Sequence, residues 1–227
     1  MKITYLGHSG FAIEAGEYHL VSDPFITPNP LVSDKKLNQL KADYLLITHG
    51  HSDHVADVEM IAGNNPGLVL VSNYEIVTYF EQKGIKGHGM NIGGQWKFDF
   101  GNVRYVNAVH SSVLPDGTYG GNPGGFVVET TEYAFYIAGD TALTWDMKLL
   151  PMLYPRLDFA ILPIGGNFTM DYKDALLAAS FMECDTIIGC HYDTFEPIRI
   201  DHQEAIKYFE DNGKTLILPE IGLTFEM

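Results

Sequence analysis

The chain has 227 residues, 46% of them hydrophobic and 12% aromatic, which suits one large domain or two small ones and rules out a disordered chain. Its 14 Lys and Arg against 29 Asp and Glu give a formal net charge of −15, and because no cationic cluster interrupts it, we expect no nucleic-acid partner. Two cysteines predict no disulfide framework and a cytoplasmic location, and no apolar run approaches the ~20 residues of a membrane span.

Taken in chain order, the hydrophobic pattern predicts strands and helices in alternation. Alternation or turn residues favour antiparallel hairpins at residues 2–6, 11–14 and 98–106. Short runs that are apolar on both faces predict strands in covered sheets at 44–48, 134–138, 159–162 and 186–189. Helical spacing occurs at 53–62, 73–83, 142–153, 172–182 and 201–212. No linker or repeat divides the chain, so we expect a single domain, 1–227, in which helices cover sheet layers.

Histidine and aspartate residues follow the ends of the predicted strands. In layered α/β proteins the loops at the carboxyl ends of strands converge, and ligands bind there. The residues that stand in such positions are His49, His51, Asp53, His54, His110, Asp140 and His191. The first four lie within six residues, where an extended loop turning into a helix can present ligands to two neighbouring points.

The dense H-x-H-x-D-H pattern predicts a metal site. Imidazole and carboxylate groups packed this closely at a strand end would be desolvated and would repel one another when protonated, and a bound cation relieves both effects. The short segment cannot complete a site alone, because catalytic zinc takes three or more protein ligands. For His19, His88 and His202, which stand apart, we favour ordinary hydrogen-bonded loop positions.

The segment Thr48–His54, with the later His110, Asp140 and His191, resembles the metallo-β-lactamase superfamily. The segments 6–11, 22–24, 138–141, 162–170 and 190–195 narrow the likeness to its bacterial metal-dependent hydrolases, relatives of ascorbate-6-phosphate lactonase and of phospholipase D acting on N-acyl phosphatidylethanolamine. The resemblance spans nearly the whole chain. It implies an α/β fold, the four-layer αββα sandwich, with a dinuclear metal site between its sheets.

The resemblance also implies a ligand set and a reaction. Metal one would be bound by His49, His51 and His110, metal two by Asp53, His54 and His191, and Asp140 would bridge them. Imidazole ligands favour Zn²⁺, while the carboxylates leave Mn²⁺, Fe²⁺ or Ni²⁺ open. A metal-bridged hydroxide would cleave a small ester, lactone, phosphoester or amide, with Asp53 orienting it or accepting its proton. Two alternatives remain at this stage, an iron-dependent oxidoreductase and a non-catalytic metal-dependent sensing module.

Beyond the metal ligands, further residues are candidates for the site. By the same resemblance, His8 would contact the substrate or donate a proton, and Asp23 would hold a ligand histidine. Asn167 and Thr169 lie on a glycine-containing loop suited to an oxyanion or phosphate. The glycine-rich segment 115–125 is a candidate lid, and Cys190 a packed core residue. We expect a small-molecule substrate and no membrane partner, and a homo-oligomer is compatible with the sequence.

Overall fold

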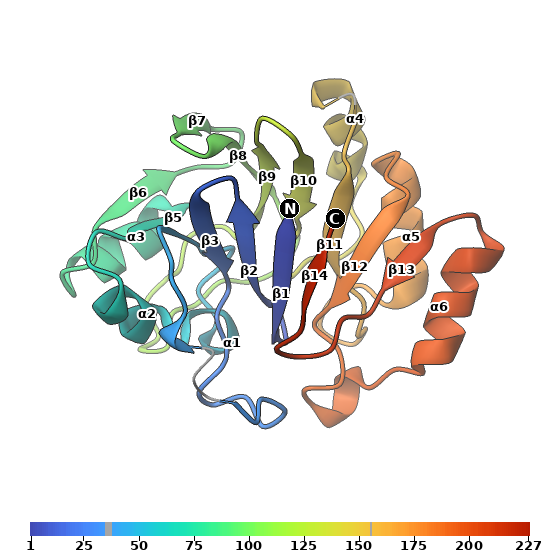
Figure 1. The fold of residues 1–227 in the computed structure, drawn as a ribbon, viewed down its shortest axis with the longest axis horizontal. Coiled ribbons are helices and arrows are strands. Elements are labelled where there is room, and N and C mark those ends of the chain that lie inside the picture. Colours follow the sequence, from blue (N-terminus) through green and yellow to red (C-terminus); the bar gives the residue numbers. More distant parts are fainter. Residues whose placement is uncertain (35–37, 155) are drawn as a thin grey trace.

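The computed structural model describes residues 1–34, 38–154 and 156–227. Within them, two seven-stranded sheets lie face to face (Figure 1). The first sheet has the order β14-β1-β2-β3-β4-β5-β6. Its strands are β1 Lys2–Gly7, β2 Gly10–Ala15, β3 Tyr18–Ser22, β4 Tyr44–Leu46, β5 Val69–Asn73, β6 Gly87–Met90 and β14 Thr224–Glu226. The pairing of β14 with β1 brings the two termini together.

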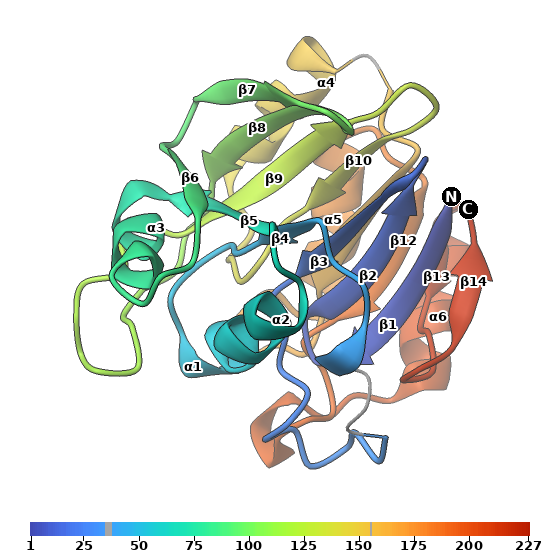
Figure 2. The same cartoon turned by 60° about the vertical axis from the view of Figure 1, so that its left-hand side comes forward.

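The second sheet has the order β13-β12-β11-β10-β9-β8-β7, and Figure 2 shows it behind the first. Its strands are β7 Gln95–Phe98, β8 Gly101–Asn107, β9 Gly124–Glu129, β10 Ala134–Ile137, β11 Phe159–Pro163, β12 Thr186–Cys190 and β13 Thr215–Ile217. The pairs from β7 to β10 are antiparallel and those from β10 to β13 are parallel. Consequently β8, β10, β11 and β12 all run in one direction.

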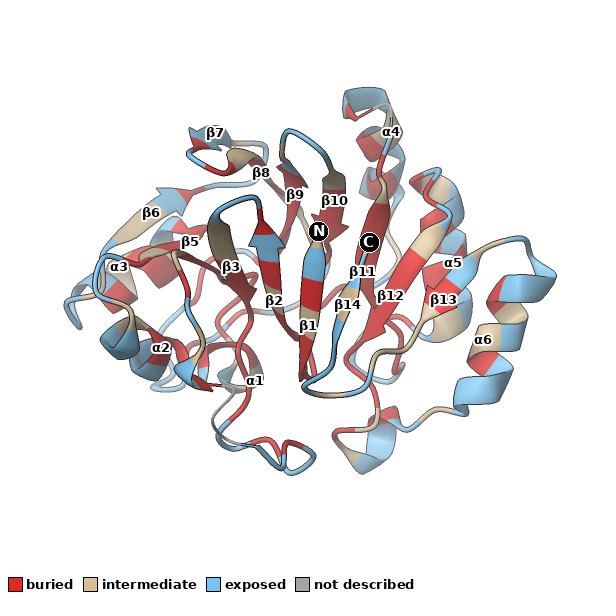
Figure 3. Cartoon of the chain, viewed as in Figure 1, coloured by how far each residue is buried: buried red, intermediate tan, exposed pale blue. Residues whose placement is uncertain are grey.

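Helices cover the outer face of each sheet, and three apolar clusters separate the layers. One cluster fills the space between the sheets, a second lies between the first sheet and α1 to α3, and a third between the second sheet and η2 and α4 to α6. Figure 3 shows the central strands largely buried, the edge strands β6, β7 and β14 largely exposed or intermediate, and the outer helix faces exposed. The helices are α1 Ser52–Val55, α2 Val58–Asn64, α3 Tyr74–Glu81, α4 Leu150–Leu153, α5 Tyr172–Phe181 and α6 His202–Asp211, with 3-10 helices η2 Trp145–Leu149 and η3 Glu196–Ile198. The expected αββα sandwich is confirmed.

No helix among the described residues has the length and apolar character to cross a bilayer. The longest have ten residues and begin at aspartates whose side chains cap them. Asp171 accepts hydrogen bonds from the first backbone N–H groups of α5, and Asp201 does the same for α6. Such caps satisfy donors that a helix cannot bond internally, which explains where these two helices start.

The structure corrects two expected helices. Residues 53–62 form α1 and α2 rather than one helix, because the backbone N–H of Asp57 donates to Pro24 O at 3.2 Å instead of continuing the helical ladder. The buried Asp57 carboxylate also accepts the N–H groups of Ile26 and Thr27 at 2.7 and 2.9 Å. Residues 142–153 form η2 followed by α4, since Pro151 has no N–H to carry one helix through both.

The other expected helices and strands are present with shifted ends, and several strands were not anticipated. The region 98–106 belongs to a hairpin, but its turn lies at residues 99–100, between β7 and β8. Six strands escaped the pattern analysis, namely β3, β5, β6, β9, β13 and β14. Most are short or partly exposed, so they lack the continuous apolar run of β11.

Asp57→Ala tests whether this carboxylate fixes the segment that follows β3. The substitution removes the acceptor for two backbone N–H groups, so we expect the free energy of unfolding to fall by about 2–4 kcal/mol in urea denaturation. Glu59→Ala is the control, because its exposed carboxylate pairs with Lys83 at the surface, and its loss should change stability by less than about 1 kcal/mol. Equal small losses in both variants would contradict this role.

Candidate metal centre

The predicted ligands come from strands of both sheets and meet at one edge of the sandwich. His49, His51, Asp53 and His54 follow β4 in the first sheet, and His110, Asp140 and His191 follow β8, β10 and β12 in the second. Because β8, β10 and β12 run in the same direction, their carboxyl ends share an edge of the second sheet. Three sets of potential ligands have their donor atoms within 4.8 Å of one another: His49, His51 and His110; His49, His54 and Asp140; and His8, Asp53, His54 and His191.

Asp140 stands between the histidine groups. Its Oδ2 lies 3.0 Å from His191 Nε2, 3.5 Å from His110 Nε2 and 3.9 Å from His49 Nε2, and its Oδ1 lies 3.4 Å from His54 Nε2. The side chain is 3% exposed, so these histidines are its surroundings in place of water. A single carboxylate therefore reaches His49 and His110 as well as His54 and His191. We call His49, His51 and His110 the first group, and Asp53, His54 and His191 the second group.

The backbone before Asp140 must pass close to β4. Gly139 adopts φ 63°, and a Cβ atom there would lie 2.5 Å from the Thr48 Cβ. Only glycine fits this position without displacing its neighbour. The glycine therefore allows Asp140 to approach the histidines that follow β4.

Asp23 and Thr48 fix the orientation of His49. Thr48 Oγ1 donates to Asp23 Oδ2 at 2.7 Å, and its N–H donates to Asp23 Oδ1 at 2.8 Å. Because the hydroxyl has one proton, it accepts from His49 Nδ1, 3.1 Å away. The lone pair of His49 is then on Nε2, which lies 3.0 Å from His51 Nδ1 on the side of the metal group. Second-sphere bonds of this kind orient metal-binding histidines.

His54 lies between two buried carboxylates. Its Nδ1 is 3.0 Å from Asp23 Oδ2 and its Nε2 is 3.4 Å from Asp140 Oδ1, although neither contact has hydrogen-bond geometry. Burial lowers the pKa of His54, but Asp140 and Asp23 outweigh it and hold the pKa well above the ordinary value. The two carboxylates thus favour a positive charge at this point, and a cation bound by His54 and Asp140 would supply one.

At His49, His51 and His110 the effect of burial on the pKa is not outweighed by the nearby carboxylates. Burial lowers the pKa of His49 well below its usual value and also lowers the pKa of His51 and of His110. Neutral imidazole is the form that binds a metal, so these side chains are ready to act as ligands near pH 7. For Asp140, burial raises the pKa, but His191 and His54 more than offset this and hold it well below the ordinary range.

The residues present fit a metal ion. Four buried polar atoms at this point have no hydrogen-bond partner within the described residues: both ring nitrogens of His54, Asp140 Oδ1 and His191 Nδ1. Buried polar groups are rarely left unpaired, because the loss of water is not compensated. Cation ligation by His54 Nε2 and Asp140 Oδ1 would remove two of these exceptions.

His8 is packed behind the second group. The ring is fully buried, with Nε2 3.1 Å from Asp53 Oδ2 and Nδ1 2.9 Å from Thr194 Oγ1. Burial lowers the pKa of His8 to about 4, although the hydrogen bond with Asp53 acts in the opposite direction. At neutral pH its single proton faces the Asp53 carboxylate, which can only accept, and Nδ1 accepts from the Thr194 hydroxyl. Within the segment 190–195, no pattern in the sequence singled out Thr194 as a site residue.

Three residues of this region hold left-handed backbone conformations. His8, Asp23 and His191 have φ values of 57°, 38° and 54°, in a region that non-glycine residues seldom occupy. The His191 N–H donates to His8 O at 2.8 Å, which ties the end of β12 to the end of β1 across the two sheets. Backbone strain of this kind persists where surrounding contacts impose it, and it concentrates at functional sites.

A cavity of about 440 Å³ lies over these groups. Its lining comprises His51, Asp53, His110, Ser111, Asp140, Phe168, His191, Phe195 and Pro197. The aromatic side chains Phe168 and Phe195 follow β11 and β12, and the strand-end motifs did not identify them as site residues. Their hydrophobic type alone resembles that of core residues, which is why the sequence could not place them.

The remaining candidates lie outside this cavity lining. Asn167 and Thr169 flank Phe168, but neither of them lines the cavity. The segment 115–125 does not line the cavity either: the Asn73 side chain donates to Gly120 O and Asn122 O, so the loop packs against the start of α3. Its last two residues, 124 and 125, belong to β9.

The histidines and cysteines interpreted as structural have ordinary surroundings. His19 contacts Asp43 at 3.1 Å, His202 contacts Asp193 at 2.6 Å, and the His88 ring lies 4.8 Å from that of Trp96. None of the three belongs to a potential metal group among the described residues. Cys190 and Cys184 are buried free thiols, as expected.

Comparisons with known proteins identify the family. The sequence model of the beta-lactamase superfamily domain matches residues 2–191. A UPF0173 metal-dependent hydrolase of Flavobacterium johnsoniae is 60% identical over the full length of both chains, and YtkL of Bacillus subtilis, of the same description, is 44% identical over 88% of this chain and 89% of its own. The chain therefore belongs to the beta-lactamase superfamily and, within it, to the UPF0173 family of metal-dependent hydrolases.

Solved structures share the fold. The metallo hydrolase Igni18 of the archaeon Ignicoccus hospitalis is 38% identical, with a TM-score of 0.88 over 100% of this chain and 98% of its own. An isothiocyanate hydrolase from Delia radicum gut bacteria superposes with a TM-score of 0.80 over 100% and 99% of the two chains. At 18% identity, this second likeness shows the fold alone.

Asp23→Asn tests the support that this carboxylate gives to His54 and, through Thr48, to His49. The amide lacks the charge that attracts His54 and accepts from Thr48 less strongly, so we expect zinc affinity to fall by about 10- to 100-fold in competition with a chromophoric chelator. Asp43→Asn is the matched control, since Asp43 meets His19 outside the site. Unchanged affinity in Asp23→Asn would show that Asp23 does not position the ligands.

Proposed function

We propose that the protein hydrolyses a small ester, lactone, phosphoester or amide with two divalent cations bound side by side. The observation that carries this proposal is the position of Asp140, whose two oxygens face histidines of both groups. The first cation would be held by His49, His51 and His110, the second by Asp53, His54 and His191, and Asp140 would contact both. Zn²⁺ suits this imidazole-rich set best, and Mn²⁺, Fe²⁺ or Ni²⁺ is compatible with its carboxylates.

Two bound cations would lower the pKa of a water molecule, which would act as the nucleophile, and would polarise the carbonyl or phosphoryl oxygen of the substrate. The water would attack the carbon or phosphorus atom bonded to that oxygen. The chain would contribute the orientation of that water. The Asp53 side chain is 23% exposed and lines the cavity, so it can accept a hydrogen bond from the water and take its proton. Asp53 would act as a base in addition to helping to hold the second cation.

His8 is a positioning residue in this proposal. Its buried ring does not line the cavity, which argues against the direct substrate contact expected from the sequence. The Nε2–H is directed at Asp53, so the same nitrogen offers no lone pair to a metal. The pair formed with Thr194 fixes the ring, and the ring in turn fixes the Asp53 carboxylate.

The cavity also supports a small-molecule substrate. Its volume of about 440 Å³ lies within the range of small-ligand pockets. With a formal net charge of −15, the surface would repel nucleic acid and anionic membranes. The buried thiols of Cys184 and Cys190 are consistent with function in the reducing cytoplasm.

Metal removal and reconstitution test the proposed reaction. After chelation and reloading, we expect the protein to bind two equivalents of zinc by elemental analysis. A screen of lactones, esters, phosphodiesters and amides should find a hydrolytic activity that is lost on chelation and restored by zinc. Activity that requires iron and consumes O₂ would instead favour an oxidoreductase, and metal binding without turnover of any class would favour a sensing module.

Asp140→Ala and His49→Ala test the two-cation arrangement. Each removes a ligand from the buried centre, so we expect turnover to be abolished and metal content to fall below two equivalents, while circular dichroism stays unchanged. His19→Ala is the control, because His19 pairs with Asp43 and belongs to no potential metal group among the described residues. Near-normal activity in metal-analysed Asp140→Ala protein would disprove the two-cation proposal.

A further inference from the structure

The outer part of the metal cavity is built from apolar side chains. Phe168, Phe195 and Pro197 line it together with the polar and ligand residues. Phe168 is 54% exposed, a large aromatic surface left in contact with water. The free energy falls when a ligand covers exposed apolar surface, so these side chains favour the binding of an apolar group.

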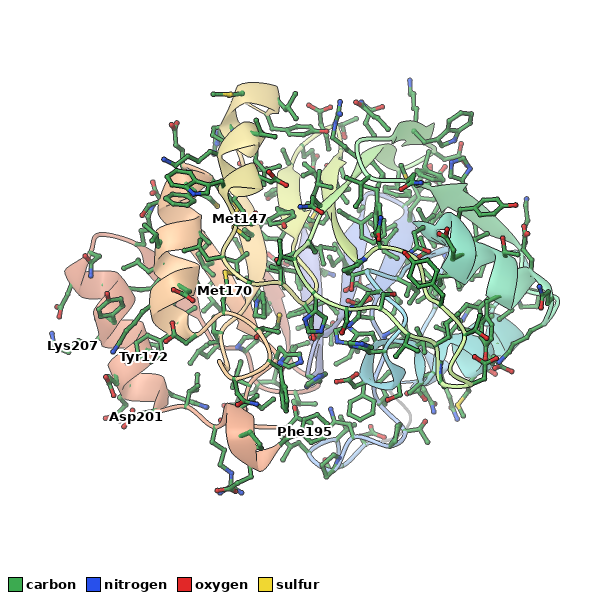
Figure 4. The ribbon with its side chains drawn as sticks, turned by 180° about the vertical axis from the view of Figure 1, so that it is seen from behind. Met147, Met170, Tyr172, Phe195, Asp201 and Lys207 are labelled. Atoms are coloured by element: carbon green, nitrogen blue, oxygen red, sulfur yellow. The ribbon has the colours of Figure 1, made fainter. Side chains whose placement is uncertain are left out.

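Phe195 is held firmly at the start of η3, where Figure 4 labels it. Its ring centroid lies 5.5 Å from that of His8 and 6.3 Å from that of Phe25. Phe168 comes from a different loop, in which Asn167 has φ 57° and the Phe168 N–H bonds to Gly166 O at 2.6 Å. Two separate loops therefore present aromatic rings to one cavity.

The cavity offers no cationic side chain. Among the described residues that line it, none is lysine or arginine, while Asp53 and Asp140 are carboxylates. Arg199, near Pro197, is paired with Glu196 at 2.9 Å, and the side chains of both are largely exposed. An anionic group on a substrate, other than the one at the metals, would lose water without gaining a partner.

We propose that the natural substrate carries an uncharged aromatic or short aliphatic group on its non-reacting part, and that this group packs against Phe168 and Phe195. This inference rests on the proposed function and narrows its substrate class. When the substrate is a carboxylic ester or lactone, water adds to the carbonyl carbon, the bond from that carbon to the alkoxy oxygen breaks, and the products are a carboxylic acid and an alcohol, joined in one molecule for a lactone. We expect compounds with a second anionic group to be poor substrates.

A pair of hydroxamic acids tests this preference by binding. Butyrohydroxamic acid and succinic monohydroxamic acid share a metal-chelating head and differ in their tails, one ending in a methyl group and the other in a carboxylate. With zinc-loaded protein in titration calorimetry, we expect the butyryl compound to bind at least about tenfold more tightly. The p-nitrophenyl esters of the same two acyl groups, corrected for spontaneous hydrolysis, should show the same order in kcat/KM.

Variants of the exposed ring connect the preference to the cavity wall. Phe168→Ala should lower the affinity for butyrohydroxamic acid by about fivefold and change the affinity for the succinic compound by less than about twofold. Phe168→Lys should raise the affinity for the succinic compound by at least about fivefold, because it places a cation beside the carboxylate of that compound. Trp145→Ala is the matched control, since Trp145 is also exposed but does not line this cavity.

The outcomes separate this inference from the function on which it rests. If neither hydroxamic acid binds zinc-loaded protein, the proposed metal site is wrong and the substrate class fails with it. If both bind equally, or the succinic compound binds more tightly, and the Phe168 variants change neither, the metal site stands and the apolar substrate class is overturned. A preference for the butyryl compound in the unmodified protein supports the proposal if it is lost in Phe168→Ala and reversed towards the charged tail in Phe168→Lys.

Discussion

The structure of the metal centre depends on the burial of several imidazole rings around one carboxylate, that of Asp140. Imidazole rings from both sheets surround Asp140, with His49 and His54 0% exposed. Rings this close would repel one another if all were protonated, and a neutral cluster would leave polar atoms without partners. Asp140 compensates positive charge on either side, and Asp23 adds a second negative charge behind His54. The site is therefore built to hold positive charge at fixed points.

The fold brings these groups together by aligning strand ends. In each sheet the strands that carry the ligands run in one direction, so their following loops open onto one edge of the sandwich. The bond from His191 N–H to His8 O joins the loops of the two sheets, and both residues accept left-handed backbone conformations to make it. The large apolar core between the sheets stabilises the arrangement, as it must if strained residues are to persist at the edge.

Much of this centre could be predicted because its ligands follow apolar strands directly. Asp140 and His191 come within three residues of β10 and β12, where strand patterning is clear and the chemistry of the side chain is distinctive. The resemblance to a known family supplied the grouping of ligands, and the family and fold are confirmed.

Other features depend on contacts that are distant in sequence. The break between α1 and α2 comes from hydrogen bonds between Asp57 and the segment after β3, which no helical pattern records. Thr194 matters only because the fold places it against His8, 186 positions earlier in the chain. Phe168 and Phe195 have the same hydrophobic type as core residues, and their role in lining the cavity emerges only when two loops meet.

We propose that Asp140 lies between two bound cations. A crystal structure of zinc-loaded protein, with anomalous scattering measured at the zinc edge, tests this proposal most directly. We predict two anomalous peaks, one among His49, His51 and His110 and one among Asp53, His54 and His191, with an Asp140 oxygen in contact with each. A single peak at full zinc loading, or peaks that Asp140 does not reach, would contradict it.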